Sequence, residues 1–188
     1  MGHTIRTATA ADAQAMLDIY AWYVENTAIT FETEVPTLED FTGRVERTLA
    51  RYPWLAVEED DGTIIGYAYA SSFVGRAAYD WSVEMSIYLQ HDTRRKGLGR
   101  ELYGAMEDIL RRMGIRNLNA CIGTTDNEND PHLTNGSVYF HEKLGYAMVG
   151  KFHKCGFKFD SWYDMVWMEK MIGPHDGTPD PIVPFPAL

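Results

Sequence analysis

The chain has 188 residues, a length typical of one domain, because single hydrophobic cores usually stop growing beyond about 250 residues. Hydrophobic residues make up 45% and charged residues 23%, which matches globular proteins and excludes disordered, collagen-like and coiled-coil chains. Seventeen Lys and Arg stand against 27 Asp and Glu, and the resulting net charge of -10 argues against general binding of nucleic acid, whose phosphates it would repel.

Membrane, disulfide and metal-binding classes are also disfavoured. No apolar run approaches the roughly 18 residues that span a bilayer, and the start lacks an apolar stretch with a cleavage site, so we expect a cytoplasmic protein without membrane contact. The two cysteines, Cys121 and Cys155, are too far apart for a CxxC pair, so we predict free thiols. No two histidines share a helical face at the spacing of metal ligands, so we predict no metal.

The first quarter of the chain predicts one strand and two helices. The strand covers 4–8, and helical spacing of apolar residues continues to about residue 26 and resumes over 38–49. Each helix follows a Thr with an Asp three residues later, the pattern of a capping box. The segment 27–36 is a loop between the two helices.

Three strands follow. The pair 54–57 and 63–70 flanks an Asp-Gly step that is typical of an antiparallel hairpin. In the strand 82–89, apolar residues alternate with polar ones, so one face enters a core. Glu84 lies on the other face.

The remaining elements complete an α/β protein with a mixed sheet flanked by helices. A clean apolar stripe predicts a helix from 98 to a glycine at 114, and the pattern then indicates a strand at 117–122, a helix at 137–144, and strands at 146–154 and 164–171. Five of the eight prolines follow residue 173. We therefore expect a domain over 1–172 and an extended proline-rich tail over 173–188.

The strongest ligand signal stands between the strand at 82–89 and the helix at 98. It comprises Arg94, Arg95, Lys96, Gly97, Leu98, Gly99 and Arg100. Free N–H groups and the positive end of a helix favour an anion there, and glycines let it approach the backbone. The third glycine of a Rossmann fingerprint and the Gly-Lys-Ser/Thr of a P-loop are both missing, so those nucleotide motifs are excluded.

The Arg-x-x-Gly-x-Gly pattern resembles the pyrophosphate-binding motif of the GNAT acetyltransferase superfamily. The stretches 76–84 (RAAYDWSVE), 140–146 (FHEKLGY) and 156–159 (GFKF), with Trp162, resemble phosphinothricin N-acetyltransferases and related amino-acid N-acyltransferases. The likeness covers roughly residues 5–171. It implies the GNAT acyl-CoA N-acyltransferase fold with acetyl-CoA as cosubstrate.

The resemblance also implies site residues. Glu84 matches the proposed base that deprotonates an ammonium substrate, and His141 stands where a proton donor to the leaving thiolate is placed. The cofactor-binding set would be Ile87, Tyr88, Leu89, the segment from Arg94 to Arg100 and Asn135, and the acceptor-binding set Phe31, Arg76 and Tyr79. Backbone N–H groups of Ile87 and Leu89 would contact the thioester arm. The guanidinium of Arg76 suits an acceptor carboxylate.

Two departures from the family pattern affect these expectations. Asn135 stands one residue closer to the following helix than the pattern predicts, which weakens its cofactor role. The loop 123–132 is longer and more acidic than in the herbicide-acetylating relatives. The preferred acceptor, or a contact between subunits, could therefore differ from that of those relatives.

We expect an N-acetyltransferase acting on the primary amine of a small amino-acid-like substrate, such as phosphinothricin or methionine sulfone, in a possible homodimer. The alternatives are an acetyltransferase for another amine, such as an antibiotic, a polyamine or a protein N-terminus, and a non-catalytic acyl-CoA sensor. Arg76 argues against a polycation because like charges would meet. A cysteine acyl-enzyme through Cys121 would need an activating base that the sequence does not show.

Overall fold

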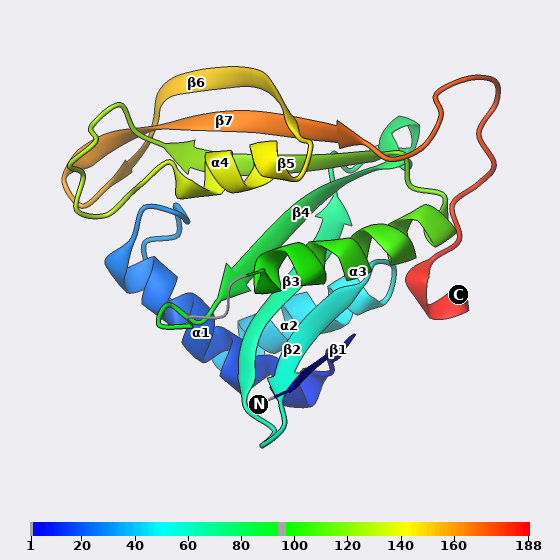
Figure 1. The fold of residues 1–188 in the computed structure, drawn as a ribbon, viewed down its shortest axis with the longest axis horizontal. Coiled ribbons are helices and arrows are strands. Elements are labelled where there is room, and N and C mark those ends of the chain that lie inside the picture. Colours follow the sequence, from blue (N-terminus) through cyan, green and yellow to red (C-terminus); the bar gives the residue numbers. More distant parts are fainter. Residues whose placement is uncertain (1, 94–96) are drawn as a thin grey trace.

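The computed structural model describes residues 2–93 and 97–188 and has one mixed sheet of seven strands. The strands lie in the order β1-β2-β3-β4-β5-β7-β6 (Figure 1). The pair β4 and β5 is parallel, and the other neighbouring strands are antiparallel. The strand bounds are β1 His3–Thr7, β2 Trp54–Glu59, β3 Ile64–Ser72, β4 Ser82–Leu89, β5 Asn117–Thr124, β6 Ala147–Lys158 and β7 Ser161–Met171.

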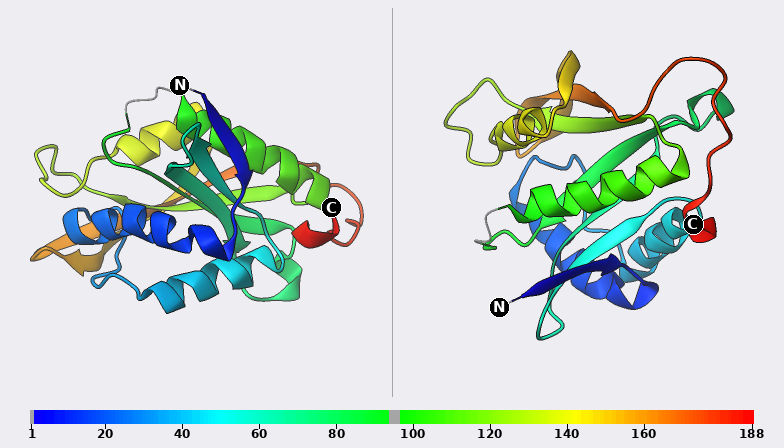
Figure 2. Two further views of the ribbon diagram at one scale, coloured as in Figure 1. Left: turned by 90° about the horizontal axis from the view of Figure 1, so that it is seen from below. Right: turned by 45° about the vertical axis from the view of Figure 1, so that its right-hand side comes forward.

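Within residues 2–93 and 97–188, four α-helices cover the two faces of this sheet (Figure 2). Helices α1 (Ala13–Asn26) and α2 (Leu38–Leu49) pack on one face, and α3 (Leu98–Met113) and α4 (Gly136–Lys143) pack on the other. Each face has its own apolar core, because the strands between them point alternate side chains in opposite directions. The predicted α/β class with a flanked mixed sheet is confirmed.

The helix ends follow the predicted caps. The carboxylate of Asp12 accepts the backbone N–H of Thr9 at 2.7 Å, and Thr37 accepts the N–H of Asp40 at 3.1 Å. Helix α3 lies between two glycines in the left-handed region, Gly97 with φ 95° and Gly114 with φ 88°. A residue with a Cβ would be strained at either place, so these glycines determine where α3 starts and ends.

The parallel pair β4 and β5 separates soon after it forms. Their register runs from Ser82 opposite Asn117 to Glu84 opposite Asn119. Beyond that point β4 continues along β3 to Leu89, and β5 continues along β7 to Thr124. The two strands diverge toward the start of α3 (Figure 1), which leaves a gap in the middle of the sheet.

The last hairpin extends further than the pattern predicts. Strand β6 continues to Lys158 and β7 begins at Ser161, because the chain reverses in the two residues Phe159 and Asp160, with φ 50° and 55°. Two consecutive left-handed residues suit a hairpin turn, but the usual Asn-Gly or Asp-Gly signal is absent here. The sequence pattern therefore underestimated both strands.

The C-terminal segment after β7 has little regular structure but packs against the domain. The N–H of Val183 donates to the Met113 carbonyl at 2.9 Å, and the N–H of Phe185 donates to the Arg51 carbonyl at 2.9 Å. Ile182 and Phe185 lie against the core beneath α3. The tail is therefore anchored at the ends of α2 and α3.

Candidate active site

The gap between β4 and β5 exposes backbone N–H groups. The N–H of Gln90 donates to the Ile65 carbonyl of β3 at 2.9 Å. Backbone groups of a strand point to alternate sides, so the N–H groups of Ile87 and Leu89 face away from β3 and into the gap. The Tyr23 hydroxyl donates to the Leu89 carbonyl at 2.7 Å, in agreement with this direction.

Two adjoining cavities open at this gap. The gap cavity, about 60 Å³, lies between β4 and β5, and His141 and Tyr103 line its α3–α4 side. The helix groove, about 460 Å³, lies between the start of α3 and α4, and Gly97, Gly99 and Arg100 line it. Ile87 lines both, so one molecule could extend from the groove into the gap.

The start of α3 suits an anion. Gly99 lies so close to α4 that a Cβ there would stand 3.1 Å from the Phe140 ring. The exposed Arg100 adds positive charge to a helix end whose N–H groups already favour anions. The Leu98 side chain is buried in the core, so only the backbone of Leu98 can contact a ligand in the groove. The expected contacts of Arg94, Arg95 and Lys96 lie outside the described residues.

Glu84 lies on the opposite side of the sheet, at the point where the gap begins. It stands opposite Ser71 of β3 and Asn119 of β5. Within residues 2–93 and 97–188 its carboxylate has no ion-pair or hydrogen-bond partner. Among these residues Glu84 therefore lacks the ion pair with Lys or Arg that is usual for a carboxylate on a protein surface. Burial raises the pKa of Glu84, as a base for an ammonium requires.

His141 is held as a neutral imidazole. Its Nδ1 lies 2.7 Å from the Ser137 carbonyl, and since a carbonyl accepts, we assign the ring proton to Nδ1. Its Nε2, 3.1 Å from the Tyr103 hydroxyl, then accepts that hydrogen bond. Burial lowers the pKa of His141. The expected proton donor thus carries no proton on Nε2 in this arrangement.

Tyr103 was missed by the sequence reasoning. It follows the apolar stripe of α3 at three and seven residues from Met106 and Leu110, so its position predicts only a core residue. The structure buries its ring in the core and points its hydroxyl to His141. Burial raises the pKa of Tyr103 well above its ordinary value, so the phenol stays protonated.

The loop between α1 and α2 borders the site, since its Ile29 lines both the gap cavity and the helix groove. Phe31 packs so tightly on β6 that a Cβ at Gly156 would lie 2.4 Å from its ring. Glu32 accepts from Arg44 of α2 at 2.7 Å. The buried Lys158 donates to the Thr30 carbonyl at 2.9 Å. These contacts position Phe31 and Glu32 against both the last hairpin and α2.

Arg76 and Tyr79 lie in the exposed segment between β3 and β4. They do not line the gap cavity or the helix groove. The Tyr79 ring contacts Phe73 at 5.9 Å between centroids, and Phe73 contacts Trp167 of β7 at 5.3 Å. Trp167 stands opposite Cys121 in the register of β5 and β7. This chain of rings joins the segment to the face on which Glu84 lies.

Two expected cofactor residues have other contacts. Asn135 accepts from the Thr124 hydroxyl at 2.7 Å and donates to the Thr125 carbonyl at 2.9 Å, so its amide holds the end of β5. It lines neither cavity, and these bonds indicate a structural role. The Tyr88 ring packs against Tyr20 and Tyr67 on the α1–α2 side, although Tyr88 also borders the gap cavity.

Cys121 is a poor nucleophile. Loss of hydration and the nearby Glu84 charge raise the pKa of its thiol to about 12, so the thiolate is scarce at neutral pH. This disfavours the cysteine acyl-enzyme alternative. Both cysteines are free, and the described part of the chain has no group of three or more His, Cys, Asp or Glu arranged to hold a metal ion.

Comparison with known proteins decides the family. The model of an acetyltransferase (GNAT) domain matches residues 5–167. The chain belongs to the GNAT acetyltransferase family. Acetyl-CoA is its cosubstrate, and the chain is an N-acetyltransferase, as the resemblance of its motifs implied.

Named relatives of this GNAT acetyltransferase cover most of its length. A phosphinothricin N-acetyltransferase of Streptomyces viridochromogenes is 39% identical, over 88% of this chain and 86% of the relative. An L-methionine sulfoximine/L-methionine sulfone acetyltransferase of Pseudomonas paraeruginosa is 30% identical, over 95% and 100%. A crystal structure of a phosphinothricin acetyltransferase from Sinorhizobium meliloti in complex with AcCoA matches with a TM-score of 0.85 and 32% identity, over 96% and 94%.

The two cavities of this GNAT acetyltransferase fit the cosubstrate. The helix groove combines a helix start, two glycines and an exposed Arg, a setting that suits the diphosphate of acetyl-CoA. The N–H groups of Ile87 and Leu89 suit its amide-bearing arm. No helix within 2–93 and 97–188 is long and apolar enough to cross a membrane.

Proposed function

We propose that this enzyme acetylates the primary amine of a small amino-acid-like acceptor of the phosphinothricin or methionine sulfone type, in the cytoplasm. The observation that carries this proposal is the unpaired, partly buried Glu84 at the mouth of the gap, on the face opposite the helix groove. Acceptor and acetyl-CoA would thus enter from the two faces of the sheet. The names of the relatives support the acceptor class.

The mechanism assigns one task to each group. Glu84 takes a proton from the acceptor ammonium, directly or through water, because a neutral amine is needed for attack on the thioester. The N–H of Ile87 or Leu89 stabilises the negative charge that develops on the thioester oxygen. His141 Nε2 carries no proton in this arrangement, so His141 delivers one to the departing thiolate only after Nε2 has taken up a proton from solvent. This last demand is weaker, since a thiolate is already a tolerable leaving group.

A coenzyme A thiol-release screen tests the acceptor class. The panel holds the amino acids with their sulfone, sulfoximine and phosphinate analogues, beside an aminoglycoside, a polyamine and a peptide N-terminus. We expect turnover with the amino-acid analogues alone. Turnover with another amine instead would assign a different class of acceptor to the enzyme. Binding of acetyl-CoA without turnover of any amine would favour a non-catalytic acyl-CoA sensor.

Arg76 is proposed to bind an anionic group of the acceptor. It is exposed and is the one arginine of the segment that joins β3 to β4. Arg76→Ala should raise the KM for the acceptor by roughly one to two powers of ten, because a charge-assisted hydrogen bond is lost. The KM for acetyl-CoA should stay unchanged. Steady-state kinetics decide the point, and equal effects on both substrates would contradict a direct contact.

We also propose that the enzyme is a homodimer through β6. This strand is at the end of the sheet order, and an exposed edge strand can pair with another chain. Large apolar side chains are exposed along the hairpin: Met148, Val149, Phe152, Phe157 and Trp162. Light scattering should give twice the chain mass for the wild type and a smaller value for Phe152→Glu. A monomeric wild type at micromolar concentration would contradict the proposal.

A further inference from the structure

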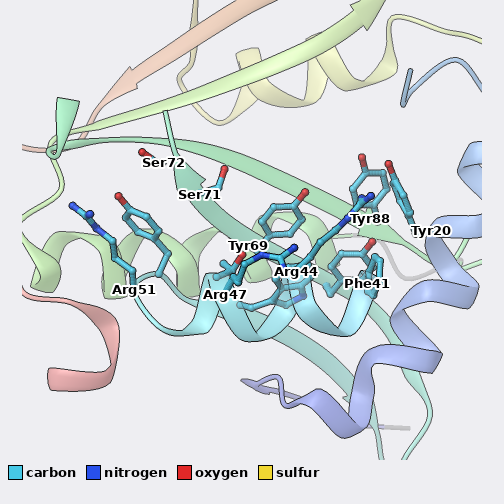
Figure 3. A pocket seen from close by; sticks show the side chains of 13 residues that line it. Tyr20, Phe41, Arg44, Arg47, Arg51, Tyr69, Ser71, Ser72 and Tyr88 are labelled. Carbon is cyan, nitrogen blue, oxygen red and sulfur yellow. The ribbon is translucent and has the colours of Figure 1, made fainter. Parts of the chain in front are cut away.

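A third cavity lies on the same face as Glu84, between α2 and the sheet (Figure 3). We call it the α2 groove; its volume is about 440 Å³, and the polar residues that line it include Arg44, Arg47, Arg51, Tyr69, Ser71 and Tyr88. Figure 3 shows Arg44 and Arg47 on α2 and Arg51 just beyond its end, with Tyr69, Ser71 and Tyr88 on the strands of the sheet. No step of the mechanism above uses these arginines.

Strand register connects the α2 groove to Glu84. Ser71 of β3 stands directly opposite Glu84, and Tyr69 stands opposite Ser86. Opposite residues of an antiparallel pair share a face, with Cβ atoms about 4.5–5.5 Å apart. A molecule whose amine lies at Glu84 therefore has the α2 groove beside it.

The groove offers many more hydrogen-bond donors than a neutral ligand needs. Guanidinium groups only donate, and the Ser71 hydroxyl can donate as well, while the hydroxyls of Tyr69 and Tyr88 have Ser86 and Thr30 as hydrogen-bond partners. This donor set matches a group with several acceptor oxygens and a negative charge. Three arginines line this one groove, although the net charge of the chain is -10.

Two of the three arginines are already paired. Arg44 donates to Glu32 at 2.7 Å, and Arg51 donates to Asp80 at 2.8 Å. Within residues 2–93 and 97–188, Arg47 has neither an ion pair nor a hydrogen bond for its guanidinium. Arg47 is therefore the charge in the groove that is available to a ligand.

Gly43, one turn before Arg47, leaves room for this guanidinium. A Cβ at Gly43 would stand 2.8 Å from Nη1 of Arg47. Glycine inside a helix is unfavourable by roughly 1 kcal/mol relative to alanine, so the position is not explained by helix stability. The guanidinium of Arg47 thus lies back along α2, over the position that has no side chain.

We propose that Arg47 is a specificity-determining residue that binds a carboxylate or phosphinate at the end of the acceptor side chain. This inference rests on the proposed function and deepens it. The acceptor amine lies at Glu84, its α-carboxylate is bound by Arg76, and its side chain extends into the α2 groove. The preferred acceptors are then anionic in their side chains, and neutral analogues such as methionine sulfone are poorer.

The test compares kcat/KM for phosphinothricin, whose phosphinate is charged, with that for methionine sulfone, which is neutral. Arg47→Gln should lower the value for phosphinothricin roughly tenfold, since hydrogen bonds to charged groups are among the stronger ones. The value for methionine sulfone should change by less than about twofold. Arg47→Lys keeps the charge without the planar fork and should recover part of the loss.

The matched control is Arg112→Gln, which removes the same charge from an exposed arginine on α3, outside the α2 groove. It should leave both values unchanged. Equal losses for both acceptors in Arg47→Gln, or no loss for either, would overturn the inference. A wild type that acetylates methionine sulfone but not phosphinothricin would overturn it while the proposed function stands. A wild type that acetylates neither would overturn both.

Discussion

Glu84→Gln is expected to lower turnover by about a hundredfold or more while acetyl-CoA still binds, because general bases typically contribute that much. The amide keeps the shape of the side chain but cannot take a proton from the ammonium. Burial raises the pKa of Glu84, so at a pH above that pKa its ionised carboxylate lowers the stability of the folded state. Removing the charge should therefore leave the melting temperature at neutral pH unchanged or higher.

The pH dependence of the rate separates Glu84 from His141. At saturating acetyl-CoA, the rate should rise with pH as the base loses its proton, and this limb should flatten in Glu84→Gln. It should persist in His141→Ala, which we expect to cost less because its task is weaker. A limb that survives in Glu84→Gln and disappears in His141→Ala would make His141 the base.

Gly99→Glu is expected to abolish measurable binding of coenzyme A. The new carboxylate would enter the helix groove at the start of α3 and repel the diphosphate. Its Cβ alone would stand 3.1 Å from the Phe140 ring, so the wall of the groove formed by α4 would shift as well. Isothermal titration calorimetry with coenzyme A measures the loss.

Gly104→Glu is the matched control for this substitution. It adds the same charge to the same helix, at an exposed glycine whose Cβ would have nothing within 4 Å and which lies outside the helix groove. Its affinity for coenzyme A should stay close to that of the wild type. A folded Gly99→Glu variant that binds like the control would reject the diphosphate site.

The sequence predicted only those parts of the candidate site that depend on a pattern within a short segment of the chain. Period-two alternation in the strand at 82–89 correctly placed Glu84 on the face away from the α3 core. The glycines at 97 and 99 correctly marked a helix start, and a groove lies beside it. Tyr103 had no such signal, since a tyrosine on an apolar stripe looks the same whether or not its hydroxyl meets a histidine.

The sequence by itself determined the order of helices and strands, their caps and the family, because these depend on spacing and composition within short segments. The tertiary structure decided which groups meet. The separation of β4 and β5, the neutral state of His141 and the place of Arg47 in the α2 groove all depend on partners far along the chain. Such contacts are set by sheet register and by the packing of helices across it, and no local pattern encodes them.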